Sequence, residues 1–183
     1  MKRFDRLLQR WRIAQVAPLV GKDARVLDIG CADGELLKTV PGIAHYVGVD
    51  PDVTPSSSTR VRFVRDVFPT PQIPDDERFD VISALAVLEH VPRQAQTGFA
   101  RACARHLAPN GMVAITVPSP IVDSILTVLK GVRLIDGMHE EEHYGYDPAA
   151  TATIFEPHGL RLLRHRRFEL GLNHLFVFQR SAG

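Results

Sequence analysis

The sequence predicts an α/β fold: a single doubly wound, mostly parallel seven-stranded sheet with an antiparallel C-terminal strand and helices on both faces. Short apolar strand segments alternate with helical segments along the 183 residues, a pattern typical of a parallel sheet covered on both sides. The last two strands are joined only by residues 170–173, too few for a parallel crossover, so they should pair antiparallel. The length corresponds to one domain, at about 150 residues per domain.

The elements follow from periodicity and from turn residues. Phe4, Leu7, Leu8, Trp11 and Ala14 recur at helical spacing and predict an N-terminal helix within residues 1–20. The expected strands cover residues 25–30, 46–50, 61–65, 79–83, 112–117, 161–168 and 174–179. Further helices are expected near residues 35–38, 94–107, 119–136 and 148–157. We divide the domain into a helix (1–20), a cofactor-binding core (21–118), a substrate-side cap (119–147) and a C-terminal helix with the antiparallel strand pair (148–183).

Composition excludes several classes of protein. Lys and Arg number 22 against 21 Asp and Glu, a formal net charge of +1, so no global positive field indicates a nucleic-acid partner. The two cysteines have neither metal-ligand spacing nor a disulfide pattern, which favours a reducing, cytoplasmic location. No apolar run reaches the ~18 residues of a transmembrane segment.

The strongest motif is VLDIGCADGELL, which begins at Val26. A buried strand here runs through a small-residue turn into a helix, and ligands of doubly wound sheets bind at such joints, against free N–H groups. Asp50 ends the second strand, twenty residues beyond Gly30, where a carboxylate can accept both hydroxyls of a ribose. The dinucleotide pattern G-x-G-x-x-G would also need glycines where Ala32 and Glu35 stand. A nucleoside cofactor is indicated, but not a dinucleotide.

These residues resemble the first motif of the class I (Rossmann-like) S-adenosylmethionine-dependent methyltransferases, an acidic residue followed by G-x-G-x-G, with Ala32 as the one departure. FDVISALAVLEHVP (79–92) and LAPNGMVAITVPS (107–119) resemble the fourth-strand and fifth-strand motifs of the small-molecule branch. The resemblance implies S-adenosyl-L-methionine as cofactor. Its implied binding residues are Asp28 and the loop Gly30, Cys31, Ala32, Asp33 and Gly34 for the methionine part, Asp50 with Pro51 for the ribose, Asp66 and Val67 for the adenine, and Ala84 and Leu85 beside the sulfonium.

Two histidines are candidate catalytic bases, because imidazole accepts a proton near neutral pH. His90 follows the fourth strand, and His143 lies in the polar segment expected to roof the crevice. The segment His139–His143 also matches the zinc-protease pattern H-E-x-x-H, but glycines at 137 and 145 leave room for only about two helical turns. Glu89-His90 resembles part of a divalent-ion motif whose first carboxylate is replaced by Ala86. We therefore expect no bound metal.

The sequence thus predicts S-adenosylmethionine-dependent methyl transfer to oxygen or nitrogen of a small-molecule acceptor, or of an amphipathic or lipid-linked metabolite. The alternative is a non-catalytic module that binds the cofactor or a partner, favoured by the alanines at 32 and 86. A nucleic-acid partner is not expected, since Ser-Ala-Leu-Ala follows the fourth strand where base-amine methyltransferases carry Asn/Asp-Pro-Pro-Tyr. The apolar segment 119–136 is a candidate homodimer interface.

Overall fold

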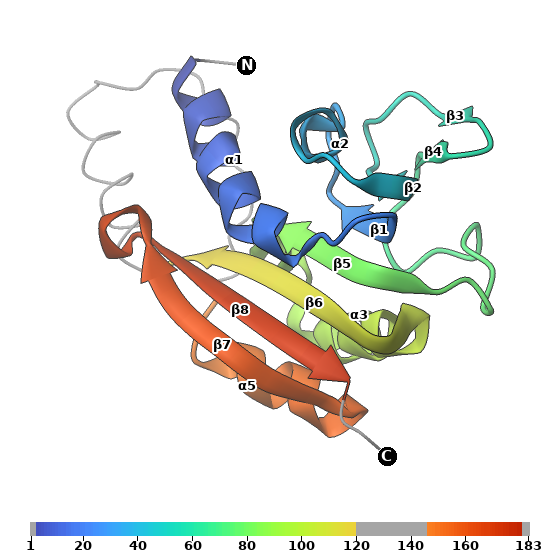
Figure 1. The fold of residues 1–183 in the computed structure, drawn as a ribbon. Helices are drawn as coiled ribbons and strands as arrows, with labels where there is room; N and C mark the ends of the chain where they lie inside the picture. The colour runs from blue at the N-terminus through green and yellow to red at the C-terminus, as the bar shows by residue number, and fades with distance from the viewer. Residues whose placement is uncertain (1–2, 120–145, 181–183) are drawn as a thin grey trace.

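The computed structural model describes residues 3–119 and 146–180. Its centre is an eight-stranded sheet in the order β3-β4-β2-β1-β5-β6-β8-β7 (Figure 1). The strands are β1 (Ala24–Ile29), β2 (Ile43–Val49), β3 (Ser56–Ser57), β4 (Val61–Val64), β5 (Phe79–Leu85), β6 (Leu107–Pro118), β7 (Leu160–Phe168) and β8 (Asn173–Arg180). The pairs from β4 to β6 are parallel, whereas β8 runs antiparallel to both β6 and β7. The predicted fold class is confirmed, with one strand more than expected.

The additional strand is β3, a two-residue segment that pairs antiparallel with the two central residues of β4. It lies at the edge of the sheet, and both of its serines are exposed. Because it is short and polar, it carries none of the apolar alternation from which a strand is predicted.

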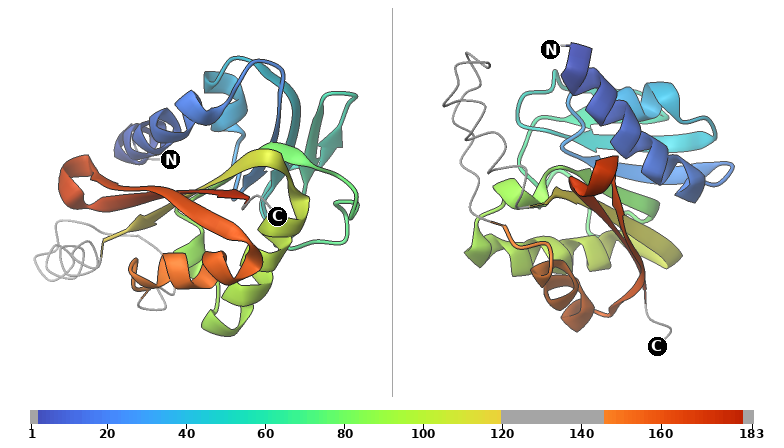
Figure 2. Two further views of the ribbon diagram at one scale, coloured as in Figure 1. Left: turned by 60° about the horizontal axis from the view of Figure 1, so that its bottom comes forward. Right: turned by 90° about the vertical axis from the view of Figure 1, so that its left-hand side faces the viewer.

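Helices cover both faces of this sheet, as Figures 1 and 2 show. One face carries α1 (Arg3–Val16) and α2 (Glu35–Thr39), and the other carries α3 (Arg93–His106) and α5 (Ala150–Phe155). Single 3₁₀ turns lie at η1 (Ala17–Leu19), η2 (Leu88–His90), η3 (Glu156–His158) and η4 (Glu169–Gly171). Within the described residues, no helix is long and apolar enough to cross a lipid bilayer.

Two hydrophobic cores result, one on each side of the sheet. On the α3 side, Phe99 and Phe155 pack against Leu27 and Ile82. The core on the α1 side is smaller and joins Ile13 and Val16 of α1 to Leu36 of α2 and to strand residues such as Val26. A large side chain burying its apolar surface contributes about 1.5–3 kcal/mol, so these cores hold the helices in place.

The orientation of α1 differs from the one that periodicity predicts. Leu7, Trp11 and Ala14, expected on the packed face, are exposed; Trp11 is 46% accessible. The buried positions are instead Ile13 and Val16. The packed face of the helix is therefore rotated by about one residue from the predicted one. Ile13 and Val16 pack the C-terminal half of the helix into the core, while the polar residues at 9 and 12 lie on the side that faces the sheet.

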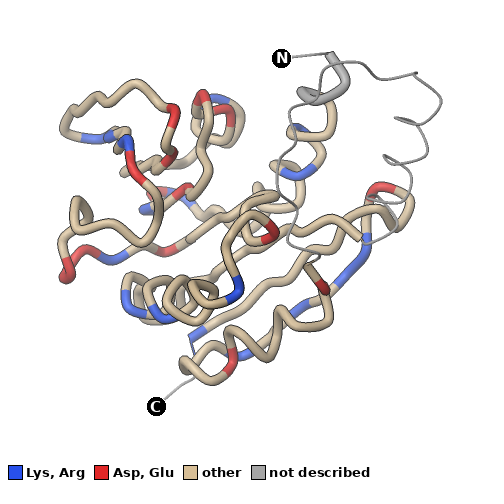
Figure 3. Tube along the Cα trace, turned by 180° about the vertical axis from the view of Figure 1, so that it is seen from behind, with Lys and Arg blue, Asp and Glu red and all other residues tan. Residues whose placement is uncertain are grey.

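Basic and acidic residues are both distributed over the described trace (Figure 3). The main basic run is on the edge strand β7, at Arg161, Arg164, Arg166 and Arg167, all of which are exposed. The expected helix and dimer interface at 119–136, and nearly all of the expected cap 119–147, lie outside the described residues.

Candidate functional site

The carboxyl ends of the parallel strands meet at one edge of the sheet, and the loop between β1 and α2 lies there. Gly30 and Gly34 both have a φ of +72°, which side chains other than glycine rarely adopt. A Cβ atom on Gly30 would lie 2.4 Å from Cγ2 of Val87, and one on Gly34 would lie 2.8 Å from Cζ of Phe63. Both the backbone conformation and the packing therefore require glycine at these two positions.

Ala32 adopts the same left-handed region without being glycine, with a φ of +45°. This conformation costs an L-residue about 1–2 kcal/mol. The backbone N–H of Ala32 donates a hydrogen bond of 2.9 Å to Oδ2 of Asp50. Residues 30, 32 and 34 thus all lie in the left-handed region, and the hydrogen bond to the residue that follows β2 helps to hold Ala32 there.

Asp28 places a carboxylate beneath this loop. Its side chain is only 4% exposed; the Tyr46 hydroxyl donates to Oδ2 at 2.7 Å and the Ser83 hydroxyl to Oδ1 at 2.8 Å. Burial raises the pKa of Asp28 to about 6, against the lowering effect of these two hydrogen bonds. Among residues 3–119 and 146–180 no ion pair to Asp28 is seen, and a desolvated carboxylate of this kind is a favourable place for the ammonium group of a ligand.

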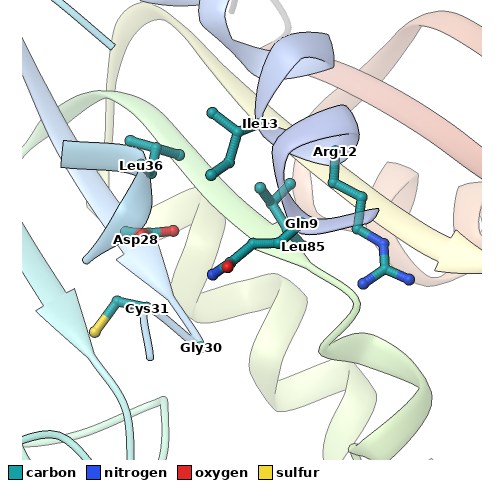
Figure 4. A pocket seen from close by; sticks show the side chains of 8 residues that line it. All are labelled: Gln9, Arg12, Ile13, Asp28, Gly30, Cys31, Leu36 and Leu85. Atoms are coloured by element: carbon teal, nitrogen blue, oxygen red, sulfur yellow. The ribbon is translucent and has the colours of Figure 1, made fainter. Parts of the chain in front are cut away.

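A cavity of about 40 Å³ lies between Asp28 and α1 (Figure 4). Its lining residues are Gln9, Arg12, Ile13, Asp28, Gly30, Cys31, Leu36 and Leu85. This volume holds only a few water molecules, because α1 lies directly over it. Residues 9, 12 and 13 were not expected to line a site. Their i, i+3, i+4 spacing places them on one face of a helix, but the apolar residues at 7, 11 and 14 predicted that a different face would pack against the sheet.

Asp50 holds the neighbouring turn as well as facing the loop. Besides the amide of Ala32, its carboxylate accepts the backbone N–H of Asp52 at Oδ1, at 2.9 Å. Each carboxylate oxygen has a second lone pair, so two ribose hydroxyls can still be accepted. Pro51, the adjacent ribose candidate, is exposed.

Asp66 organises the turn after β4. Its Oδ2 accepts hydrogen bonds from Thr70 Oγ1 at 2.5 Å and Gln72 Nε2 at 3.0 Å, and its Oδ1 accepts the backbone N–H of Val67 at 2.8 Å. These bonds lower the pKa of the Asp66 carboxyl, with that from Thr70 contributing most. The remaining lone pair of Oδ1 is free to accept an amine, while the side chain of Val67 is 67% exposed and open to a ring.

The two residues expected beside the sulfonium fall on opposite faces of β5. Leu85 lines the cavity, whereas Ala84 is fully buried in the core on the α3 side. The Ala84 side chain therefore points away from the cavity, since successive strand residues point to opposite faces, and a contact of Ala84 with the cofactor stays a prediction.

The remaining loop candidates differ in exposure. Cys31 lines the cavity and is buried. Because burial raises the pKa of its thiol, Cys31 is an unreactive lining residue and not a nucleophile. Asp33 is exposed and forms an ion pair of 3.4 Å with Nζ of Lys38; such a surface pair contributes little stability.

The candidate bases are only partly covered by the structure. His90 ends η2, directly after β5, and is half-buried. His143 and the whole His139–His143 segment lie outside the described residues. Among residues 3–119 and 146–180, no group of three or more His, Cys, Asp or Glu side chains could hold a metal ion.

Several known proteins similar to this chain are named as methyltransferases. A ubiquinone biosynthesis O-methyltransferase of Rhodopseudomonas palustris (strain HaA2) is 25% identical over 142 residues, which cover 73% of this chain. The chain spans only 55% of that relative's length.

Solved structures share the fold at lower identity. The Burkholderia thailandensis 1,6-didemethyltoxoflavin-N1-methyltransferase, crystallised with 1,6-didemethyltoxoflavin and S-adenosylhomocysteine, has a TM-score of 0.69 at 20% identity and matches 96% of this chain and 79% of its own. N-methyltransferase NodS from Bradyrhizobium japonicum WM9 has a TM-score of 0.66 at 16% identity, with 97% and 99% covered.

A family model described as a methyltransferase domain matches residues 2–165, most of the chain. Membership of this family, together with solved neighbours that contain S-adenosylhomocysteine, implies S-adenosylmethionine as the cofactor. The chain belongs to this methyltransferase domain family, within the class I S-adenosylmethionine-dependent methyltransferases that the sequence resembles.

Proposed function

We propose that this chain transfers a methyl group from S-adenosylmethionine to an oxygen or nitrogen atom of a small-molecule acceptor, including an amphipathic or lipid-linked metabolite. The observation that carries the proposal is the buried Asp28 carboxylate, held by two hydroxyls beneath a glycine-rich loop and next to a cavity. When bound, the cofactor supplies a methyl group that is already activated on a sulfonium.

The residues around the cavity fit the chemistry of this cofactor. Asp28, which lines the cavity, would hold the ammonium group of the cofactor. Asp50 would accept the ribose hydroxyls, and Asp66 with Val67 would contact the adenine edge. The helix α1 must shift or its side chains must rearrange, because a cavity of about 40 Å³ is smaller than an amino-acid group.

The acceptor would approach from the carboxyl ends of β5 and β6. The name of the Rhodopseudomonas relative, an O-methyltransferase of ubiquinone biosynthesis, supports oxygen and an amphipathic acceptor. The name of the Burkholderia neighbour, an N1-methyltransferase, keeps nitrogen as the second option. His90 is the proposed general base, with His143 as the second candidate, since a hydroxyl or amine loses a proton as it attacks. The cytoplasmic location stays a prediction.

The experiment is a single-turnover assay with S-adenosylmethionine labelled on its methyl group. The acceptors are 4-ethylcatechol, for oxygen, and 4-ethylaniline, for nitrogen. We expect labelled product from one of them, and none after heat denaturation. Binding of S-adenosylhomocysteine without transfer to either acceptor would instead favour the non-catalytic module.

A further inference from the structure

Three polar side chains lie near one another between α1 and the turn that joins β7 to β8. Arg12 comes from α1, Glu169 from η4 and Asn173 from the start of β8. Glu169 is only 8% exposed and Asn173 only 3%. The Asn173 amide donates a hydrogen bond to Oε2 of Glu169. Burial raises the pKa of Glu169, while the positive charge of Arg12 and the Asn173 hydrogen bond lower it.

Each of these side chains also has one buried polar atom without a hydrogen-bond partner in the described part of the chain. These atoms are Nε of Arg12, a donor, and Oε1 of Glu169 and Oδ1 of Asn173, both acceptors. Buried polar atoms are nearly always hydrogen-bonded, and exceptions call for an explanation such as a ligand. The turn is strained as well, since Glu169 and Leu170 both have a positive φ, of 52° and 56°.

The strand register places this cluster on the same face of the sheet as the cavity. Leu85, which lines the cavity, pairs with Thr116 of β6, and Thr116 pairs with Leu175 of β8. Asn173 lies two residues from Leu175 and therefore on the same face as the cavity. Two strand spacings separate β5 from β8, which is on the order of 10 Å across the sheet. Arg12 connects the two places, because it also lines the cavity (Figure 4).

We propose that Arg12, Glu169 and Asn173 form a subsite that binds a second, non-reacting hydroxyl group of the methyl acceptor. A hydroxyl has one donor and two acceptor lone pairs, so it can donate to Glu169 or Asn173 and accept from Arg12. The acceptor class is then an elongated molecule with a hydroxyl on the order of 10 Å from the atom that is methylated. This assignment rests on the proposed function, because it describes the far end of the same site.

The test compares two catechols that differ by one hydroxyl. Hydroxytyrosol carries an ethanol side chain, and 4-ethylcatechol lacks only its terminal hydroxyl. Their dissociation constants are measured by calorimetry with protein saturated with S-adenosylhomocysteine. We expect hydroxytyrosol to bind about tenfold more tightly, the effect of a hydrogen bond to a charged group. In Glu169→Gln the preference for hydroxytyrosol should fall to within about twofold. The glutamine amide can itself donate a hydrogen bond to Oδ1 of Asn173, and it offers no negative charge to the ligand.

The control is Glu156→Gln, which removes an exposed carboxylate and should keep the full preference. Glu169→Gln should melt at an unchanged or higher temperature and bind S-adenosylhomocysteine as the wild type does, whereas a merely structural glutamate would give a lower melting temperature and an unaltered preference. Equal binding of the two catechols, binding of neither, or a preference that survives in Glu169→Gln overturns the subsite. If S-adenosylhomocysteine itself does not bind the wild type, the proposed function fails and the subsite with it.

Discussion

Replacing Asp28 by asparagine should stabilise the free protein. Asn has the same size but carries no charge, and the Asp28 carboxylate is buried with its pKa raised from 3.8 to about 6. A difference of about two pKa units corresponds to about 3 kcal/mol, the largest gain in unfolding free energy expected at pH 8. Because the folded pKa is raised, the contribution of Asp28 to stability is full below about pH 4 and is lost as the pH rises through 6. The gain from Asp28→Asn should therefore vanish near pH 4.

Binding of S-adenosylhomocysteine should change in the opposite direction. Its ammonium group would pair with the ionised carboxylate, and losing a hydrogen bond to a charged group costs about 1.5–3 kcal/mol, which is about tenfold to a hundredfold in affinity. In the wild type, Asp28 is largely protonated at pH 5 and largely ionised at pH 7, since its pKa is about 6. The affinity should therefore rise about tenfold between these pH values, and Asp28→Asn should abolish that rise.

Urea denaturation at pH 4, 6 and 8 measures the first effect, and calorimetric titration at pH 5, 6 and 7 measures the second. Asp76→Asn is the control, since Asp76 is exposed and its neutralisation should change neither quantity. A variant Asp28→Asn that is less stable at pH 8 and binds S-adenosylhomocysteine as tightly as the wild type would show that Asp28 is structural, and the assignment to the ammonium would be refuted.

Three further substitutions test the loop, the ribose position and the base. Gly30→Ala should lower the unfolding free energy by about 2–4 kcal/mol in urea denaturation, because its backbone is left-handed and the new Cβ would collide with Val87. The control Gly98→Ala, in α3 with open space around it, should raise the unfolding free energy by about 0.5–1 kcal/mol. Equal effects of the two substitutions would contradict the packing argument. Asp50→Ala should weaken the binding of S-adenosylhomocysteine about tenfold to a hundredfold in calorimetry. It should also lower the melting temperature, because two backbone amides lose their hydrogen-bond acceptor. An unchanged affinity would remove the assignment of Asp50 to the ribose. His90→Ala should slow single-turnover methylation of 4-ethylcatechol by ~100- to 10,000-fold without weakening the cofactor, and a rate independent of His90 would exclude it as the base.

The sheet could be predicted from the sequence because buried strands, helices and turn residues alternate so regularly. Which face of the sheet each strand residue points to could not be predicted. A parallel strand buried on both sides is continuously apolar, so nothing in FDVISAL distinguishes Ala84, in the α3-side core, from Leu85, in the cavity wall. Only the register against the neighbouring strands decides between them.

The residues with which α1 lines the cavity could not be predicted for a related reason. Its apolar residues predict a packed face through Leu7 and Trp11, yet the helix packs through Ile13 and Val16, and its polar residues 9 and 12 line the cavity next to Asp28. That choice depends on how the helix meets the sheet, which is a long-range contact. The same holds for Asp50: its position after β2 predicted a ligand contact, but its two hydrogen bonds to backbone amides became evident only in the folded chain.

The most direct test of the central claim is a calorimetric titration of the wild-type protein with S-adenosylhomocysteine at pH 7, repeated in the presence of NAD. The geometry of the loop, with Gly30, Gly34 and the acidic residues at 28 and 50, leads us to expect one site per chain and no competition by NAD. Tight binding of NAD together with no heat from S-adenosylhomocysteine would contradict the assignment of the cofactor, and with it the proposed methyl transfer.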